Sequence, residues 1–201
     1  ASRWQSRGPQ RVSVNVSALQ IRSPEFVSWV RDSLDEHGLD ASQLVLEITE
    51  STFVAEIESA SHNLASLRAL GVLIALDDFG TGYSSLSYLK TFPLDYLKID
   101  RAFVRDLESS ESDLEIVRTI IAMSTRLKLL IIAEGVETPA QLRILQSQDC
   151  TFMQGLLLSR PVPAAEYQEK FLVLGSAKQE SAELTLCRNA LGRPSHTNVG
   201  T

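Results

Sequence analysis

LIALDDFGTGYSSL, residues 73–86, is the stretch that decides the fold. Four apolar residues lead directly into Asp77 and Asp78, and a loop with Gly80 and Gly82 follows. This pattern predicts a buried strand whose carboxyl end carries two carboxylates into a cleft. Two acids in such a position repel each other and lose hydration, so they require a cationic partner, and a divalent metal ion meets that need.

The acidic pair also fits two other interpretations. Aspartate is a favoured N-cap residue, so Asp77 or Asp78 could simply cap the helix that follows. Asp78-Phe79-Gly80 matches the metal-binding triplet of protein kinases, but no glycine-rich phosphate loop or His-Arg-Asp segment precedes it. The kinase interpretation is therefore set aside, whereas helix capping stays open as an alternative.

Composition and charge limit the classes of partner. The chain has 201 residues, of which 44% are hydrophobic, so it can bury a core and is predicted to form one domain. Its net charge of -6 argues against a nucleic-acid polymer as partner, but suits a small phosphorylated ligand held through metal ions. Cys150 and Cys187 show no metal-ligand spacing, which predicts a cytoplasmic domain. No apolar run approaches the ~20 residues of a membrane span, and a membrane-anchored parent protein stays open.

Strand and helix patterns alternate six times along the chain, which predicts parallel strands joined by helical crossovers. The predicted strands cover residues 11–17, 44–50, 73–77, 96–100, 129–135 and 152–155. The predicted helices cover residues 23–37, 56–70, 84–91, 113–127, 138–147 and 166–174. The polar composition that follows predicts a domain over residues 1–174 and a disordered or loosely docked tail over residues 175–201.

One polar or charged residue lies at or near the carboxyl end of each predicted strand. These residues are Asn15, Glu47, Asp77, Lys98, Glu134 and Gln154. In a parallel barrel the strand ends converge on one face, where ligands and catalytic groups lie. Taken singly, Asn15 could be a turn former, Lys98 a surface lysine and Gln154 a loop hydrogen-bonder. A charge such as Glu134 after a long apolar run is rarely unpaired, and the six residues together predict a metal-dependent site.

The same segments resemble the motifs of bacterial EAL domains. The segments are VNVS at 14–17, EITE at 47–50, DDFGTGYSSL at 77–86, KIDR at 98–101, AEGVET at 133–138 and QG at 154–155. The resemblance covers roughly residues 10–173. It implies an α/β fold similar to a TIM barrel with one antiparallel strand, and it implies hydrolysis of cyclic di-GMP to the linear dinucleotide pGpG.

Carried over residue by residue, the resemblance implies two Mg²⁺ or Mn²⁺ ions. Asn15, Glu47 and Asp77 would ligate one ion, and Asp78 would serve the second. Magnesium favours oxygen ligands, which agrees with a set of one asparagine and several carboxylates. Two ions about 3.5–4 Å apart can lower the pKa of a water and stabilise both the attacking and the leaving oxygen of an in-line displacement.

The resemblance implies further roles around the ions. Lys98 would orient the attacking water, and Glu134 would hold a water beside the ions, which makes these two the expected catalytic residues. Gln154 would lie next to this water and the substrate. Glu50 would anchor the loop that follows the aspartate pair, with support from Glu137.

The sequence departs from the family pattern upstream of the asparagine motif. There the family carries the Glu-Ala-Leu signature, with a metal-ligating glutamate and a nearby arginine that binds substrate phosphate, and this signature is absent here. Six of the eight barrel strands are accounted for, so an open sheet edge is expected. The chain is therefore expected to be either a fragment of a longer protein, which its start at Ala1 favours, or a degenerate domain.

Three functional hypotheses follow from the sequence. The first is a cyclic di-GMP phosphodiesterase domain, impaired in this truncated chain and fused upstream to sensory or GGDEF domains. The second is a non-catalytic module that binds cyclic di-GMP or docks a protein. The third is an unrelated metal-dependent barrel hydrolase that acts on another phosphoester. A homodimer is compatible with the family.

Overall fold

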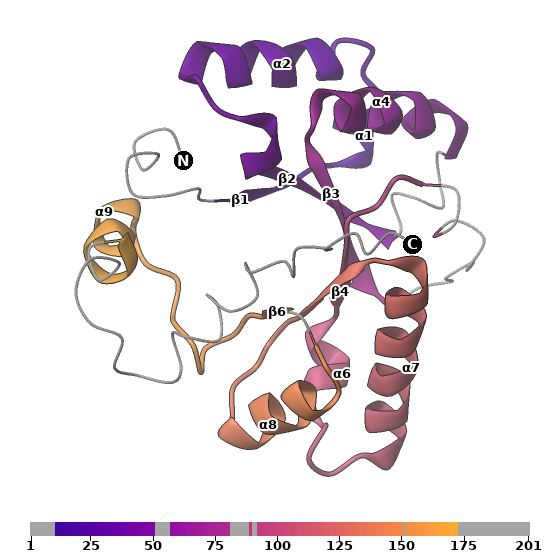
Figure 1. Cartoon of the computed structure of the whole chain (residues 1–201), viewed down its shortest axis with the longest axis vertical. Helices are drawn as coiled ribbons and strands as arrows, with labels where there is room; N and C mark the ends of the chain where they lie inside the picture. The colour runs from indigo at the N-terminus through magenta and orange to yellow at the C-terminus, as the bar shows by residue number, and fades with distance from the viewer. Residues whose placement is uncertain (1–10, 51–56, 81–88, 90–91, 151, 173–201) are drawn as a thin grey trace, which may run out of the picture.

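Six parallel strands form a curled half-barrel in the computed structural model, which describes residues 11–50, 57–80, 89, 92–150 and 152–172 (Figure 1). The strands are β1 (Val12–Asn15), β2 (Leu44–Thr49), β3 (Leu73–Phe79), β4 (Tyr96–Ile99), β5 (Leu130–Ala133) and β6 (Phe152–Met153). Each strand pairs in parallel with the next strand along the chain. The predicted parallel strands and the truncated barrel-like α/β fold are confirmed.

Helices connect the strands and gather in two groups. The helices are α1 (Ala18–Arg22), α2 (Phe26–His37), α4 (Ile57–Leu70), α6 (Arg101–Arg105), α7 (Glu111–Leu127), α8 (Pro139–Ser147), α9 (Ala164–Tyr167), the 3₁₀ turn η2 (Ala41–Gln43) and the π-helical turn η3 (Gln168–Leu172). Figure 1 shows α1, α2 and α4 beside β1–β3, and α6, α7 and α8 beside β4–β6. None of the helices described has the length and apolar character that crossing a bilayer requires.

Several predicted helix boundaries are confirmed, whereas the starts of α2, α7 and α9 differ from the predicted ones. Thr138 and Gln141 form the predicted capping box at the start of α8, and Gly38 ends α2 in the left-handed conformation with a φ of 57°. The helix predicted from Ser23 begins only at Phe26, because Ser23 instead ends α1. The predicted helix over residues 84–91 lies almost wholly outside the described residues, as does the predicted tail.

Alternation along the strands separates two apolar clusters on opposite faces of the sheet. One face carries Leu46, Ile74 and Leu97 into the main core, which also contains residues of α4 and α7. The other face carries a smaller cluster of Val45, Ala75 and Tyr96. Glu47, Asp77 and Lys98 each follow a member of this smaller cluster by two residues in the same strand. These three charged residues therefore lie on the inner face of the half-barrel.

β1 is an edge strand of the described sheet, as the sequence predicts. It pairs with β2 alone within the described sheet, and three of its four residues are exposed. Val14 is 46% exposed, although it belongs to a strand and is apolar. An edge of this kind offers unpaired backbone groups to a further strand.

Replacing Ser124 with alanine is expected to raise the free energy of unfolding by about 1 kcal/mol. Ser124 is fully buried in α7, and its hydroxyl has no hydrogen-bond partner among the described residues. Removing the hydroxyl therefore ends a desolvation penalty and leaves only a small change in volume. Urea unfolding would measure the change, with Ser147→Ala on the exposed surface of α8 as the control. A loss of stability in Ser124→Ala would contradict the expectation.

Candidate metal-dependent active site

Lys98 lies at the centre of a cluster of carboxylates contributed by neighbouring strands. Its Nζ lies 2.7 Å from Glu47 Oε2, 2.9 Å from Asp77 Oδ1 and 2.7 Å from Glu134 Oε1. Glu47 belongs to β2, Asp77 to β3 and Lys98 to β4, while Glu134 directly follows β5. Only 4% of Lys98 is exposed, so the surface-lysine interpretation is wrong.

The carboxylates keep the Lys98 ammonium charged. Burial by itself lowers the pKa of Lys98, but hydrogen bonds to Glu134, Glu47 and Asp77 outweigh it and raise the pKa above its ordinary value. Burial also raises the pKa of Glu134, and its hydrogen bond with Lys98 opposes that shift. A charged lysine and several carboxylates thus share one buried site.

Asp78 joins the cluster through an unusual backbone conformation. Its φ is 55°, which only a few non-glycine residues adopt, and its peptide N–H donates to Asp77 Oδ1 over 3.0 Å. Loss of hydration raises the pKa of the Asp78 carboxyl, and Asp77 and Asp100 raise it further. Except for position 89, the helix predicted over residues 84–91 lies outside the described residues, so the capping alternative is not tested.

The donor set fits a divalent cation. Carboxylate oxygens of Asp77, Asp78 and Glu134 all lie within 4.8 Å of one another. They are hard oxygen ligands, which Mg²⁺ and Mn²⁺ prefer. Glu47 is ion-paired with Lys98, as Asp77 and Glu134 are, so a fourth carboxylate lies close to these three.

Glu50 contacts the start of the loop that follows the aspartate pair. Its Oε2 accepts a hydrogen bond of 3.1 Å from the Gly80 N–H, and the residue is buried. Gly80 has a φ of 98°, and a Cβ there would lie 2.8 Å from Cε2 of Phe103. The hydrogen bond between Gly80 and Glu50 ties this turn to the end of β2. The effect of Glu50 on activity stays a prediction.

Three other predicted site residues lie outside the Lys98 cluster. Asn15 is directly opposite Glu47 in the strand register, but its side chain is exposed at the edge strand. Glu137 and Gln154 are also exposed, and within the described ranges no ion pair or hydrogen bond joins any of the three to Lys98. Their predicted roles stay predictions.

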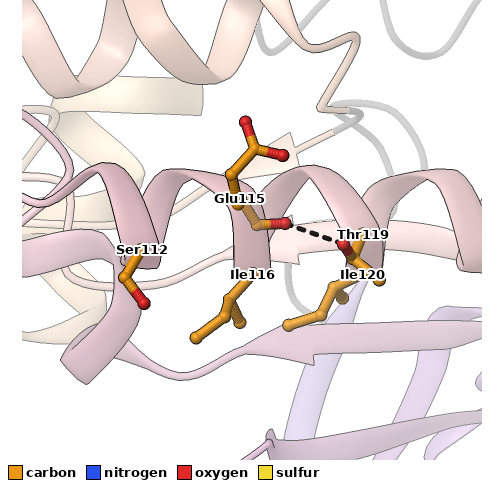
Figure 2. A pocket seen from close by; sticks show the side chains of 5 residues that line it. All are labelled: Ser112, Glu115, Ile116, Thr119 and Ile120. Atoms are coloured by element: carbon orange, nitrogen blue, oxygen red, sulfur yellow. Dashed lines mark hydrogen bonds between the residues drawn. The ribbon is translucent and has the colours of Figure 1, made fainter.

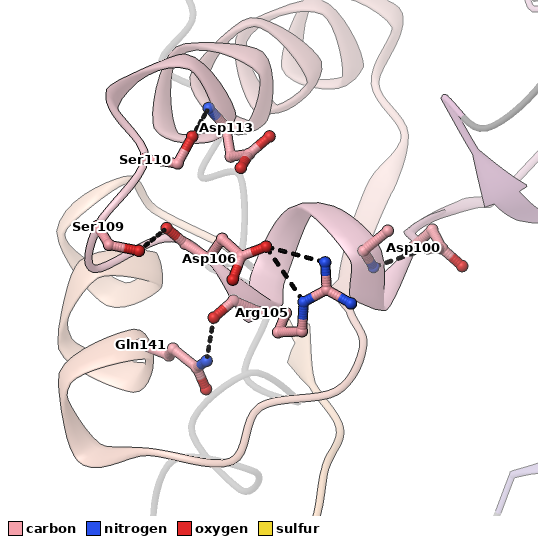
Figure 3. Close-up of polar contacts among 8 residues, drawn as sticks. Asp100, Arg105, Asp106, Ser109, Ser110, Asp113 and Gln141 are labelled. Atoms are coloured by element: carbon pink, nitrogen blue, oxygen red, sulfur yellow. Dashed lines mark hydrogen bonds and ion pairs between the residues drawn. The ribbon is translucent and has the colours of Figure 1, made fainter.

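Asp100 is a member of the group that the sequence patterns did not single out. It contributes to the raised pKa of Asp78 through a side-chain hydrogen bond and through its charge. Its Oδ1 also accepts the Ala102 N–H over 2.7 Å, which caps α6 (Figure 3). Its position in the sequence could have indicated this role, because Asp100 follows Lys98 by two residues at the point where β4 ends.

Gln141 is a second residue that sequence reasoning did not assign to the site. Its Oε1 accepts hydrogen bonds of 2.8 and 3.0 Å from the N–H groups of Glu137 and Thr138. Its Nε2 donates to the Arg105 carbonyl over 3.1 Å (Figure 3). The buried amide therefore holds the segment after Glu134 against the end of α6.

A hollow on α7 is a poor candidate for the same chemistry. It is lined by Ser112, Glu115, Ile116, Thr119 and Ile120 (Figure 2). The Thr119 hydroxyl donates to the Glu115 carbonyl over 2.8 Å within the helix. Its one proton is therefore used by the helix backbone. None of the residues at the strand ends lines this hollow.

The fold and the cluster define a (β/α)-barrel domain with a candidate divalent-metal site at the carboxyl ends of its strands. The sequence model described as the EAL domain matches residues 1–161. The chain belongs to the EAL domain family.

Several relatives carry a named activity or ligand. The chain is 47% identical over 159 residues to the cyclic di-GMP phosphodiesterase NbdA of Pseudomonas aeruginosa, covering 79% of this chain and 20% of that protein. It superimposes on the PaMucR phosphodiesterase in a c-di-GMP complex with a TM-score of 0.78 at 45% identity, over 82% of this chain and 68% of that chain. It also resembles BlrP1 of Klebsiella pneumoniae in a manganese and cyclic di-GMP complex, with a TM-score of 0.74 at 34% identity, over 80% and 42% of the two chains.

The chain spans 26% of the length of the first curated relatives that it matches.

Proposed function

We propose that this chain is a phosphodiesterase domain that hydrolyses cyclic di-GMP to linear pGpG with two Mg²⁺ or Mn²⁺ ions. The observation that carries the proposal is the buried cluster in which Lys98 contacts three carboxylates at the strand ends. The named activity of NbdA and the c-di-GMP complex of PaMucR support the substrate. The manganese complex of BlrP1 supports the kind of ion.

The residues divide into those that hold ions and those that act on the reactants. Asp77 and Asp78 present neighbouring carboxylates, and Asn15 and Glu47 lie opposite each other on the adjacent strands. When bound, the ions would lower the pKa of the attacking water and stabilise the leaving oxygen. We assign ion binding to these four residues.

Lys98 and Glu134 act on the reacting water in this proposal. Their ion pair of 2.7 Å fixes the buried ammonium donor of Lys98 beside the partly buried carboxylate of Glu134. A water beside this pair could accept a hydrogen bond from the ammonium and donate one to the carboxylate, which would orient it for attack. Gln154, exposed after β6, would contact the substrate, and Glu50 with Glu137 would steady the loops.

A second candidate function is a binding module without turnover. The place of Asn15 on the exposed edge strand β1 favours it, because no ion pair or side-chain hydrogen bond between the described residues joins Asn15 to the Lys98 cluster. In this form the domain would hold cyclic di-GMP or dock a protein partner. Both forms fit a cytoplasmic domain of a longer protein with sensory or GGDEF domains upstream, and MucR is named as a bifunctional diguanylate cyclase and phosphodiesterase. A homodimer belongs to the same proposal.

Turnover of cyclic di-GMP with Mg²⁺ or Mn²⁺ tests the proposal. The assay would compare this chain with one lengthened upstream by ~60 residues, enough for two further strand and helix units. We expect pGpG from the lengthened chain, and a lower rate or none from the chain as it stands. If neither forms pGpG while both bind metal, the phosphodiesterase proposal fails and the binding module replaces it. Equal hydrolysis of an unrelated phosphodiester would indicate a different hydrolase.

A further inference from the structure

We propose that Lys98 is the internal counter-ion of the metal-free site, and that it competes with the divalent cation for the same carboxylates. The inference rests on the proposed function in so far as that function makes the cluster a metal site. It goes further, because it assigns Lys98 a positioning role in the absence of metal and predicts the direction in which Lys98 changes metal affinity.

The first step is the charge balance of the cluster. Glu47, Asp77 and Glu134 are brought together by strand pairing, and each is at most partly exposed. Carboxylates held this close repel one another in a poorly hydrated position unless a cation neutralises them. The Lys98 ammonium contacts all three over 2.7–2.9 Å and thereby keeps the cluster assembled.

The second step is that Lys98 and the candidate ion use overlapping ligands. Asp77, Asp78 and Glu134 carry the oxygens that lie within 4.8 Å of one another, and two of these three residues are also ion-paired with Lys98. A dication that takes up those oxygens meets an ammonium at short range. Repulsion between the two cations is strong there, because a buried site screens charge poorly.

The third step is the consequence for affinity. Metal binding must weaken at least part of the Lys98 contacts, so the lysine reduces the net gain in free energy from binding. Removing the ammonium should therefore tighten metal binding while it weakens the metal-free fold. A lysine that only helps to hold the ion through shared ligands would show the opposite change in affinity.

Binding of Mn²⁺ to the full chain tests the inference. Titration followed by electron paramagnetic resonance would compare the wild type with Lys98→Met, which removes the charge and retains much of the length. We expect the dissociation constant for Mn²⁺ to fall at least about tenfold in Lys98→Met. In EDTA the Tm of this variant should fall by roughly 5 °C or more, and Mn²⁺ should raise it by more than it raises that of the wild type.

Two control variants separate the local effect from net charge. Lys170→Met removes a charge from an exposed lysine that pairs with Glu166, and it should leave Mn²⁺ affinity unchanged. Lys98→Arg keeps the charge at the site and should keep the affinity within about threefold of the wild type. An unchanged or weaker Mn²⁺ affinity in Lys98→Met overturns the inference.

A measurement on the wild type covers the case in which Lys98→Met does not fold. The buried ammonium of Lys98 should give a slowly exchanging ¹⁵N signal in EDTA, and Mg²⁺ should shift that signal as the contacts change. A signal that Mg²⁺ saturation leaves in place would overturn the inference while the proposed function stands. If no divalent ion binds to the wild type, the metal-dependent function and the inference both fail.

Discussion

Replacing Glu47 with glutamine is expected to lower kcat for cyclic di-GMP at least about 100-fold in the chain form that turns it over. Glu47 is buried in β2, and its Oε2 accepts a hydrogen bond of 2.7 Å from Lys98 Nζ. Glutamine keeps the shape of the side chain but removes the negative charge with which Glu47 would attract an Mg²⁺ or Mn²⁺ ion. Mn²⁺ affinity should fall with the rate, and assays of pGpG formation and Mn²⁺ titration would measure the two effects.

The fold should survive this substitution. Losing the sole partner of a buried charge costs about 3–5 kcal/mol, but Lys98 retains Asp77 and Glu134, so the loss of stability should be smaller. Glu36→Gln, on an exposed part of α2, is the matched control and should leave rate and affinity unchanged. Normal turnover by a folded Glu47→Gln protein would show that Glu47 is not an ion ligand needed for the reaction.

Opposite effects on metal affinity distinguish the two members of one ion pair. Glu47→Gln removes a negative charge from the cluster and should weaken Mn²⁺ binding, whereas Lys98→Met removes the positive charge and should tighten it. Both variants disrupt the same contact of 2.7 Å, so a general loss of structure cannot explain changes of opposite sign. The pair therefore separates electrostatic competition from simple damage to the fold.

The sequence predicted the sheet well because its strands carry strong local signals. β3 is an apolar run that ends in acids, and β5 is a second such run, so the short apolar run and the acid and glycine after it indicated both strands. The short helices α1 and α6 escaped prediction, since five residues cannot show a helical period. Their caps were nevertheless visible as Ser17 with Gln20 and as Asp100.

The arrangement of the candidate site was harder to predict than its membership. Lys98 is buried because residues from β2, β3 and the end of β5 reach one ammonium, and that depends on strand register across the sheet. A lysine in a short strand gives no local sign of such contacts. In the same way, the exposure of Asn15 follows from the edge position of β1 and not from its own motif.

Replacing Gly155 with alanine is expected to destabilise the fold by about 3 kcal/mol or more. A Cβ at this position would lie 2.1 Å from the Val136 carbonyl oxygen and 2.3 Å from the Val136 nitrogen. These are backbone atoms of a fully buried residue, so no side-chain rotation can relieve the overlap. The Val136 N–H donates a hydrogen bond to the Gln154 carbonyl, and the Val136 carbonyl accepts one from the Leu157 N–H. Both hydrogen bonds would be strained.

Gly38→Ala separates this overlap from the general cost of replacing a glycine. Gly38 has a φ of +57° with nothing within 4 Å of a built Cβ, so alanine there should cost only about 1 kcal/mol through backbone strain. Urea unfolding of both variants would measure the difference. Because the Val136 segment directly follows Glu134, any folded Gly155→Ala protein should also bind Mn²⁺ more weakly than Gly38→Ala. Equal stability of the two variants would show that the segments around Gly155 and Val136 can move apart without cost. The close contact at Gly155 would then not constrain the site.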